Sequence, residues 1–118
     1  MSKEKVVIYL KSTCITCRRA LGRLRKHRVE VEEVDIFKRK LTKSEIRNLL
    51  KFADVSPRDA LRRKDKMYKE LKLDEIGYDD ERILSFMEKN PGLILRPIVV
   101  RGEKATIATK PDLVNKIL

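Results

Sequence analysis

The chain has 118 residues, of which 42% are hydrophobic and 40% charged, and its formal net charge is +11. This length suits a single domain over residues 1–118, and the apolar fraction excludes a disordered chain. No apolar run is long enough to cross a membrane, and residues 1–5 lack the apolar core of a secretory signal. We therefore expect a cytoplasmic protein. The net charge of +11 predicts an anionic partner. Charge alone does not distinguish a small oxyanion, a nucleic acid and an acidic protein surface.

The first half of the chain has the pattern of a β-α-β unit. A β-branched run at residues 5–10 predicts a strand, and leucines on a helical period predict a helix over 17–27. Valines at 29, 31 and 34 predict a second strand, which a crossover helix would place parallel to the first. A second helix, 42–52, is predicted to open on a capping box formed by Thr42 and Glu45.

The second half predicts helices followed by a hairpin. Helical stretches are expected at 56–62 and 66–71, and acids at 79–81 precede a helix over 80–89. Strands at 97–100 and 104–106 are joined by a Gly-containing turn, and a last helix covers 112–118. The predicted fold is α/β and thioredoxin-like, with a mixed four-stranded sheet and a helical insertion.

Two cysteines stand where the first strand gives way to the first helix. Cys14 and Cys17 form a C-x-x-C motif, which in a cytosolic protein is more plausibly redox-active than structural. The helix dipole and unpaired N–H groups at a helix start favour the thiolate of Cys14 over its thiol. Cys17 is three residues on, which permits a disulfide without requiring one. The lone His27 adds too few ligands for zinc, so we expect no metal site.

Several cations are candidates for holding an oxyanion near this thiol. Arg96 lies between two apolar runs and precedes Pro97, which we expect to be a cis-proline at the start of a strand. Arg62 and Arg63 lie in a basic run that is also compatible with a solvated surface, and Arg18 and Lys110 are further candidates. Guanidinium groups match oxyanions bidentately, so the thiolate would attack a bound centre.

Three segments make the sequence resemble the ArsC/Spx family, the arsenate reductase-like branch of thioredoxin-fold proteins. They are Tyr9 with Cys14 to Ala20, Ala60 to Leu71, and Asn90 to Val100, whose N-P-G-L…R-P-I-V-V pattern is quite specific; the tail from Lys110 to Leu118 also matches. The resemblance implies that Cys14 is the nucleophile that forms a thiol–arsenate adduct. It further implies that Arg62 and Arg96 bind the oxyanion and that Arg96 precedes the cis-proline.

The chain departs from both subfamily patterns. Lys110 stands where classical reductases have a third arginine, and Ile15-Thr16-Cys17 replaces their Gly-Thr-Ser. The C-x-x-C pair is closer to Spx, but residues 52–57 lack the glycine associated with polymerase contact.

Two hypotheses follow. The first is a reductase acting on an oxyanion or a disulfide, with no bound cofactor and with thioredoxin or glutathione and glutaredoxin as external reductant. The second is an Spx-like regulator whose Cys14–Cys17 disulfide alters binding to the RNA polymerase alpha subunit. A generic thiol–disulfide role is a third possibility.

Overall fold

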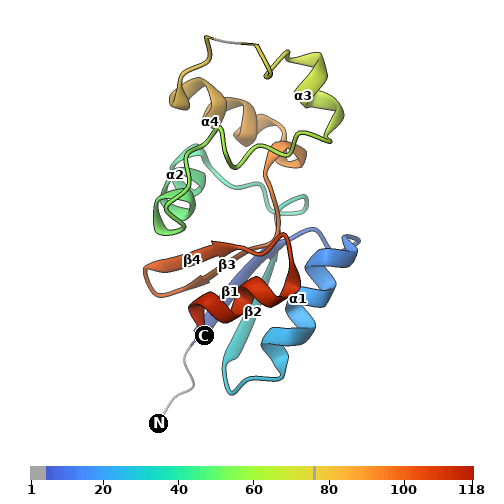
Figure 1. Cartoon of the computed structure of the whole chain (residues 1–118), viewed down its shortest axis with the longest axis vertical. Helices are drawn as coiled ribbons and strands as arrows, with labels where there is room; N and C mark the ends of the chain where they lie inside the picture. Colours follow the sequence, from blue (N-terminus) through green and yellow to red (C-terminus); the bar gives the residue numbers. More distant parts are fainter. Residues whose placement is uncertain (1–4, 76) are drawn as a thin grey trace.

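The computed structural model describes residues 5–75 and 77–118 and contains one mixed sheet flanked by helices (Figure 1). The predicted α/β architecture is confirmed. In chain order the elements are β1 (Lys5–Leu10), α1 (Ile15–Arg25), β2 (Glu30–Asp35), α2 (Lys43–Phe52), α3 (Lys66–Glu70), α4 (Asp80–Lys89), the 3₁₀ helix η1 (Pro91–Leu93), β3 (Ile98–Arg101), β4 (Lys104–Ile107) and the 3₁₀ helix η2 (Pro111–Ile117).

The sheet has the strand order β2-β1-β3-β4. β1 pairs with β2 in parallel, as the β-α-β pattern predicted, whereas β3 is antiparallel to both β1 and β4. The two-residue turn between β3 and β4 includes Gly102, whose φ of 63° is a left-handed conformation that glycine adopts readily. This topology places the C-terminal end of β1, which leads to Cys14, beside the N-terminal end of β3.

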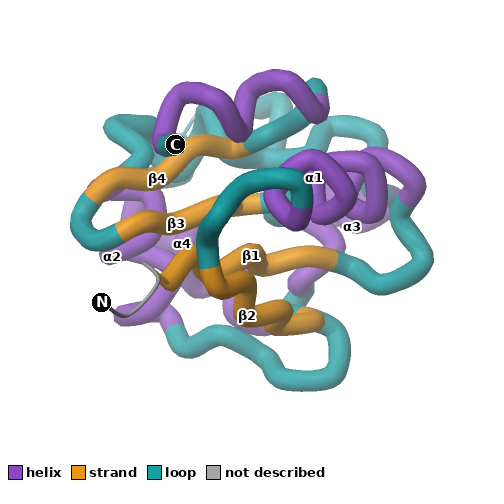
Figure 2. The backbone as a smooth tube through the Cα atoms, turned by 90° about the horizontal axis from the view of Figure 1, so that it is seen from below, coloured by secondary structure: helices purple, strands orange, loops and turns teal. Residues whose placement is uncertain are grey.

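Two apolar clusters lie on opposite faces of the sheet, because alternate residues of a strand point to opposite sides. On one face, Val6, Ile8 and Leu10 of β1 pack against α1 and η2. On the other face, Ile98 of β3 joins the side chains of α2 and α4. Figure 2 shows the helices on the two sides of the strands, and Figure 1 shows α2, α3 and α4 gathered at one end of the molecule.

The capping box predicted at α2 is confirmed. The Thr42 hydroxyl accepts a hydrogen bond from the Glu45 N–H at 3.1 Å, and the Glu45 carboxylate accepts one from the Thr42 N–H, also at 3.1 Å. These contacts satisfy two N–H groups that a helix start leaves without backbone partners. The helix is therefore anchored at its first residue by local chemistry.

The prediction of a helix over residues 56–62 is wrong. A single turn forms there, with the Ala60 N–H donating to the Ser56 carbonyl at 3.1 Å, and the chain then becomes extended. Leu61 forms an antiparallel bridge with Ile94, supported by the Leu95 N–H donating to the Ala60 carbonyl at 2.9 Å. This long-range pairing overrides local helix propensity, and it brings the segment that follows Leu61 next to the start of β3.

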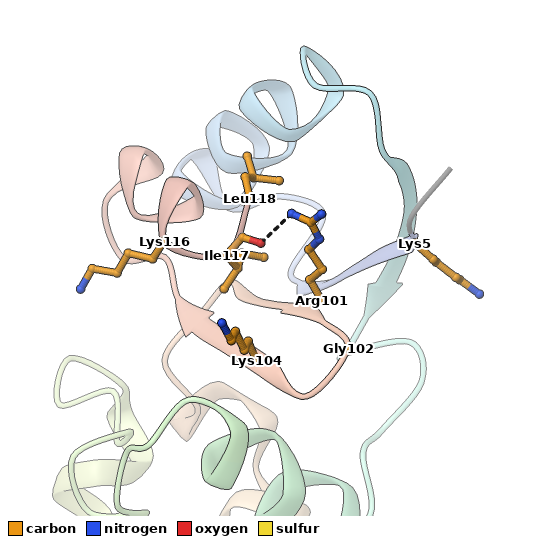
Figure 3. Close-up of a pocket in the computed structure, with 7 residues that line it drawn as sticks. All are labelled: Lys5, Arg101, Gly102, Lys104, Lys116, Ile117 and Leu118. Carbon is orange, nitrogen blue, oxygen red and sulfur yellow. Dashed lines mark hydrogen bonds between the residues drawn. The ribbon is translucent and has the colours of Figure 1, made fainter. Parts of the chain in front are cut away.

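The last helix is found where it was expected, but it is a 3₁₀ helix rather than an α-helix. Arg101 in β3 holds its end, because Nη1 donates to the Ile117 carbonyl at 3.1 Å (Figure 3). Val114 and Ile117 are buried against the β1 face of the sheet. This packing covers the sheet surface next to α1.

Candidate active site

Cys14 is the N-cap residue of α1 and is half-buried at the C-terminal end of β1. Its Sγ accepts a hydrogen bond from the Cys17 N–H, with a sulfur–nitrogen distance of 3.4 Å. Burial raises the pKa of the Cys14 thiol, but hydrogen bonds from Cys17 and Arg96 and the charge of Arg96 outweigh burial and bring the pKa below its ordinary value. The positive end of the helix dipole acts in the same direction. The fold therefore favours a thiolate at this position.

Cys17 lies one turn into α1 and has no exposed surface. Burial raises the pKa of its thiol to about 12, and the hydrogen bond to Cys14 acts in the same sense. Cys17 thus stays protonated at neutral pH and donates to the neighbouring sulfur. Both cysteines are free thiols in this structure. The pair combines an accessible, acidic thiol with a buried, weakly acidic one, which suits a nucleophile and a resolving thiol.

Cys14 opens into a cleft of about 560 Å³ whose walls come from four separate segments. Arg62 and Arg96 both line this cleft, so the structure brings together the thiol and the two arginines expected from the sequence. Arg62 arrives through the bridge between Leu61 and Ile94, and its own N–H donates to the Leu93 carbonyl at 2.7 Å. The remaining lining residues are Thr16, Asp59, Leu61, Arg63, Lys64, Leu95 and Thr109.

Arg96 is fixed on its outer side by an aromatic ring. Its Cζ lies 5.5 Å from the centroid of Phe37, and Lys11 Nζ lies 4.9 Å from the same ring. Nε and Nη1 of Arg96 are buried and have no hydrogen-bond partner among residues 5–75 and 77–118. Because buried N–H groups are normally hydrogen-bonded, these two nitrogens leave part of the donor capacity of Arg96 unused beside the cleft. The Arg96–Pro97 peptide bond is cis.

Asp35, at the end of β2, orders the loop that leads to Cys14. Its carboxylate accepts a hydrogen bond from the Ser12 N–H at 3.1 Å and another from the Ser12 hydroxyl. It also accepts from the Phe37 N–H at 2.8 Å. The Asp35 carboxylate therefore holds two segments in place. One is the turn before Cys14, and the other is the backbone of Phe37, whose ring contacts Arg96. Neither Asp35 nor Phe37 was a candidate from the sequence, since both roles depend on long-range placement.

The other candidate cations, Arg18, Arg63 and Lys110, are exposed, and of these Arg63 alone lines the cleft. Arg63 is exposed at the lining of the cleft, whereas Arg18 is exposed on α1 beside a separate hollow. Lys110 is exposed and is absent from the cleft lining, where its neighbour Thr109 is found instead. Arg62 also has an acidic neighbour, because its Nη1 lies 3.8 Å from Oδ1 of Asp65. Four cations thus line the cleft, of which Arg62 and Arg96 are partly buried and Arg63 and Lys64 are exposed.

A second basic hollow, of about 490 Å³, lies near the opposite end of β1 (Figure 3). It is lined by Lys5, Arg101, Gly102, Lys104, Lys116, Ile117 and Leu118. Lys5 points away from Arg101 in Figure 3 and pairs with Glu32 at 3.2 Å. No cysteine is among the residues that line this hollow.

Neither a metal centre nor a membrane span is found in the part of the chain that the structure describes. Within residues 5–75 and 77–118, no three His, Cys, Asp or Glu side chains are grouped so that they could hold a metal ion. No helix in those ranges has the length and apolar character that crossing a bilayer requires.

A family model described as the ArsC family matches residues 9–117. The chain belongs to the ArsC family. Its structure is similar to the arsenate reductase from Vibrio cholerae, with a TM-score of 0.95 and 28% identity over 99% of this chain and 100% of the other. The family assignment and the thioredoxin-like fold expected from the sequence motifs are therefore confirmed.

Two proteins with similar sequences have different names. The chain is 34% identical to the uncharacterized protein YfgD of Escherichia coli K12, over 98% of each chain. It is 25% identical to the global transcriptional regulator Spx of Listeria innocua, over 96% of this chain and 86% of the relative. Proteins similar to this chain thus carry the names of both a reductase and a regulator.

Proposed function

We propose that the protein is a thiol-dependent oxidoreductase that reduces arsenate or a chemically related oxyanion. The observation that carries this proposal is the shared cleft of Cys14, Arg62 and Arg96. A thiolate is a nucleophile, and the two arginines supply donors and positive charge for a tetrahedral anion. The likeness to an arsenate reductase from Vibrio cholerae supports the same substrate class.

The proposed reaction begins with attack of the Cys14 thiolate on As(V). A sulfur–arsenic bond forms, and one arsenate oxygen takes up protons and leaves as water. Arg62 and Arg96 stabilise the charge on the remaining oxygens. A second thiolate then attacks the Cys14 sulfur, and the electron pair of the sulfur–arsenic bond passes to arsenic. As(III) leaves as arsenite, and Cys14 remains in a disulfide that an external thiol reductant must reduce.

Cys17 is our candidate for the second thiol. Its backbone N–H contacts Cys14 Sγ at 3.4 Å, and its thiol donates to the same sulfur. Burial is the main cause that raises the pKa of the Cys17 thiol to about 12, and the charge of Cys14 raises it further. Formation of the adduct removes that charge, so the Cys17 thiol becomes more acidic after the first step than before it. Resolution by Cys17 would give an internal disulfide, which requires recycling of the thioredoxin type. Resolution by glutathione would make Cys17 dispensable and would require glutaredoxin.

Arsenate-dependent NADPH oxidation tests the proposal directly. The assay couples the protein either to thioredoxin and its reductase or to glutathione, glutaredoxin and glutathione reductase. We expect turnover with the thioredoxin system in wild type, none in Cys14→Ser, and loss of that turnover in Cys17→Ala. Turnover of Cys17→Ala with glutathione alone would assign resolution to the external thiol. No arsenate-dependent turnover with either system would refute the proposed substrate.

A second candidate function is a redox-switched regulator similar to Spx. It is supported by the contact between Cys14 and Cys17 and by the 25% identity to Spx from Listeria innocua. In this function the disulfide would change binding to the RNA polymerase alpha subunit. A pull-down of the alpha C-terminal domain under oxidising and reducing conditions tests it, with Cys17→Ala as the variant that cannot form the disulfide. Binding that is equal in both conditions would exclude the switch.

A further inference from the structure

We propose that the exposed residues beside the Cys14 cleft form a docking surface for an acidic protein that carries the reducing dithiol. The proposal rests on the proposed reductase function and names the kind of reductant that the surface fits. We call this surface the rim. Its members are Ile15, Arg18, Arg19, Arg63 and Lys64.

The cations around Cys14 fall into an inner and an outer group. Arg62 and Arg96 are partly buried in the cleft, where they can reach a small anion. The four cations of the rim are instead exposed, and within residues 5–75 and 77–118 none of them has an ion pair. Asp59 is the one acid among the described residues that line the cleft. The outer cations therefore face solvent with their charge uncompensated, which suits an acidic surface arriving from outside.

Ile15 gives the rim an apolar centre beside the nucleophile. It follows Cys14 directly and is 66% exposed, more than the other large hydrophobic side chains that are exposed in the described residues. With Arg18 and Arg19 it lines a hollow of about 330 Å³. Protein interfaces typically combine a central apolar residue with arginines around it. Neither a small oxyanion nor a phosphate backbone gains from an exposed isoleucine, so the pattern favours a protein partner.

The chemistry of recycling also requires a partner at this place. A thiolate of the reductant must attack the disulfide that holds Cys14, so the reductant must cover the residues around that sulfur. A mixed disulfide forms between the two proteins, and the second thiol of the reductant then displaces Cys14 as a thiolate. Two electrons pass from the dithiol, which ends as an internal disulfide. The surface around Cys14 is therefore the surface that the reductant contacts.

The test uses a disulfide that requires no arsenate. On a Cys17→Ala background, Cys14 is converted to its mixed disulfide with 5-thio-2-nitrobenzoate, whose release is followed by absorbance. The reductants are dithiothreitol, a thioredoxin with an acidic surface around its thiols, and a protein dithiol with a basic one. The variants are Ile15→Ala and Arg19→Glu/Lys64→Glu, in which Arg19 comes from the hollow on α1 and Lys64 from the lining of the cleft. The matched control is Arg28→Glu/Lys104→Glu, which makes the same change in charge at exposed sites outside the rim.

We expect Arg19→Glu/Lys64→Glu to slow reduction by the acidic thioredoxin about tenfold at low ionic strength, relative to its rate with dithiothreitol. At high salt the difference should shrink to about threefold, because exposed charges are screened. Ile15→Ala should slow reduction by the acidic thioredoxin about threefold at all salt concentrations. The control should change the ratio of the rate with the acidic thioredoxin to the rate with dithiothreitol by less than about twofold. With the parent protein, the basic dithiol should react more slowly than the acidic thioredoxin.

The proposal is overturned if the acidic thioredoxin has no advantage over the basic dithiol, or if the rim and control variants slow it equally. It is also overturned if Arg19→Glu/Lys64→Glu loses binding to a fluorescent DNA duplex while its reduction rates match the parent, since the rim would then bind nucleic acid. Because the assay contains no arsenate, a failure of the proposed reductase activity leaves this result independent.

Discussion

Replacing Gly92 by alanine should weaken the structure around Arg62 through a single contact. A Cβ at Gly92 would lie 2.5 Å from Oδ1 of Asp65, whereas ordinary van der Waals contact begins at 3.4 Å, so the carboxylate must move by about the difference of 0.9 Å. Asp65 is the N-cap of α3 and its Oδ2 accepts from the Met67 N–H at 3.1 Å. Its Oδ1 also lies 3.8 Å from Nη1 of Arg62.

The magnitude follows from two opposing effects. Loss of the N-cap of α3 should destabilise the protein by about 1 kcal/mol. Alanine also restricts the unfolded chain more than glycine, which stabilises by about 0.5 kcal/mol where the backbone conformation is compatible. Without the Asp65 carboxylate, only the second effect remains. Gly92→Ala should therefore be about 1 kcal/mol more destabilising in wild type than in an Asp65→Ala background.

Urea unfolding of the four proteins in this double-mutant cycle measures the coupling energy. The matched control pairs Gly92→Ala with Thr42→Ala, which removes the N-cap of α2 and should be additive with it. A coupling energy below about 0.3 kcal/mol between Gly92 and Asp65 would refute the reasoning. It would mean that the carboxylate moves away from Gly92 without losing its contact to α3.

Three further predictions concern the cleft. Phe37→Leu removes the ring that contacts Arg96 and Lys11 and should lower the free energy of unfolding, measured in urea, by about 1 kcal/mol. Phe37→Tyr keeps an aromatic ring and should have the stability of wild type. Equal stability of the Leu and Tyr variants would contradict a cation–π role. Arg62→Ala should raise the KM for arsenate at least about tenfold, because it removes a charge-assisted contact. Arg63→Ala should change this KM less than about twofold. Equal effects of the two variants in steady-state assays would contradict the division into inner and outer cations. Burial raises the pKa of Asp35, but the Ser12 and Phe37 hydrogen bonds outweigh burial and bring it below the ordinary carboxyl value. Its stabilising effect is therefore complete above the pKa of Asp in the unfolded chain and is lost as pH falls through the lower folded value, so unfolding measured from pH 6 to 2 should be less pH-dependent in Asp35→Asn than in wild type. An unchanged pH dependence would contradict the anchoring of Ser12.

Local signals in the sequence were enough to predict the elements that begin and end on their own residues. The capping box at Thr42 and the β-branched run of β1 depend on neighbours within a few residues, and both are as expected. The placement of Cys14 at the start of α1 follows from the same kind of signal. The β-α-β pattern then predicts the parallel pairing of β1 and β2 from topology alone.

The residues that complete the cleft depend on contacts between distant parts of the chain. The extended backbone at Leu61 exists because Ile94 pairs with it, and periodicity within 56–62 carries no information about that partner. Likewise, nothing near Phe37 in the sequence indicates that its ring will contact Arg96. Arg62, directly after this bridge, is partly buried, whereas its neighbour Arg63 is exposed. Sequence reasoning therefore named the inner arginines but not the residues that hold or shield them.

The pH dependence of Cys14 alkylation by iodoacetamide tests the central claim most directly. The rate is measured in wild type, in Arg96→Gln and in a short peptide that contains a single cysteine, with mass spectrometry to assign the modified residue. We expect the wild-type midpoint to lie below that of the peptide and the Arg96→Gln midpoint to lie above that of wild type, with Cys17 unmodified throughout. A wild-type midpoint equal to or above that of the peptide would contradict a thiolate stabilised by the start of α1 and by Arg96.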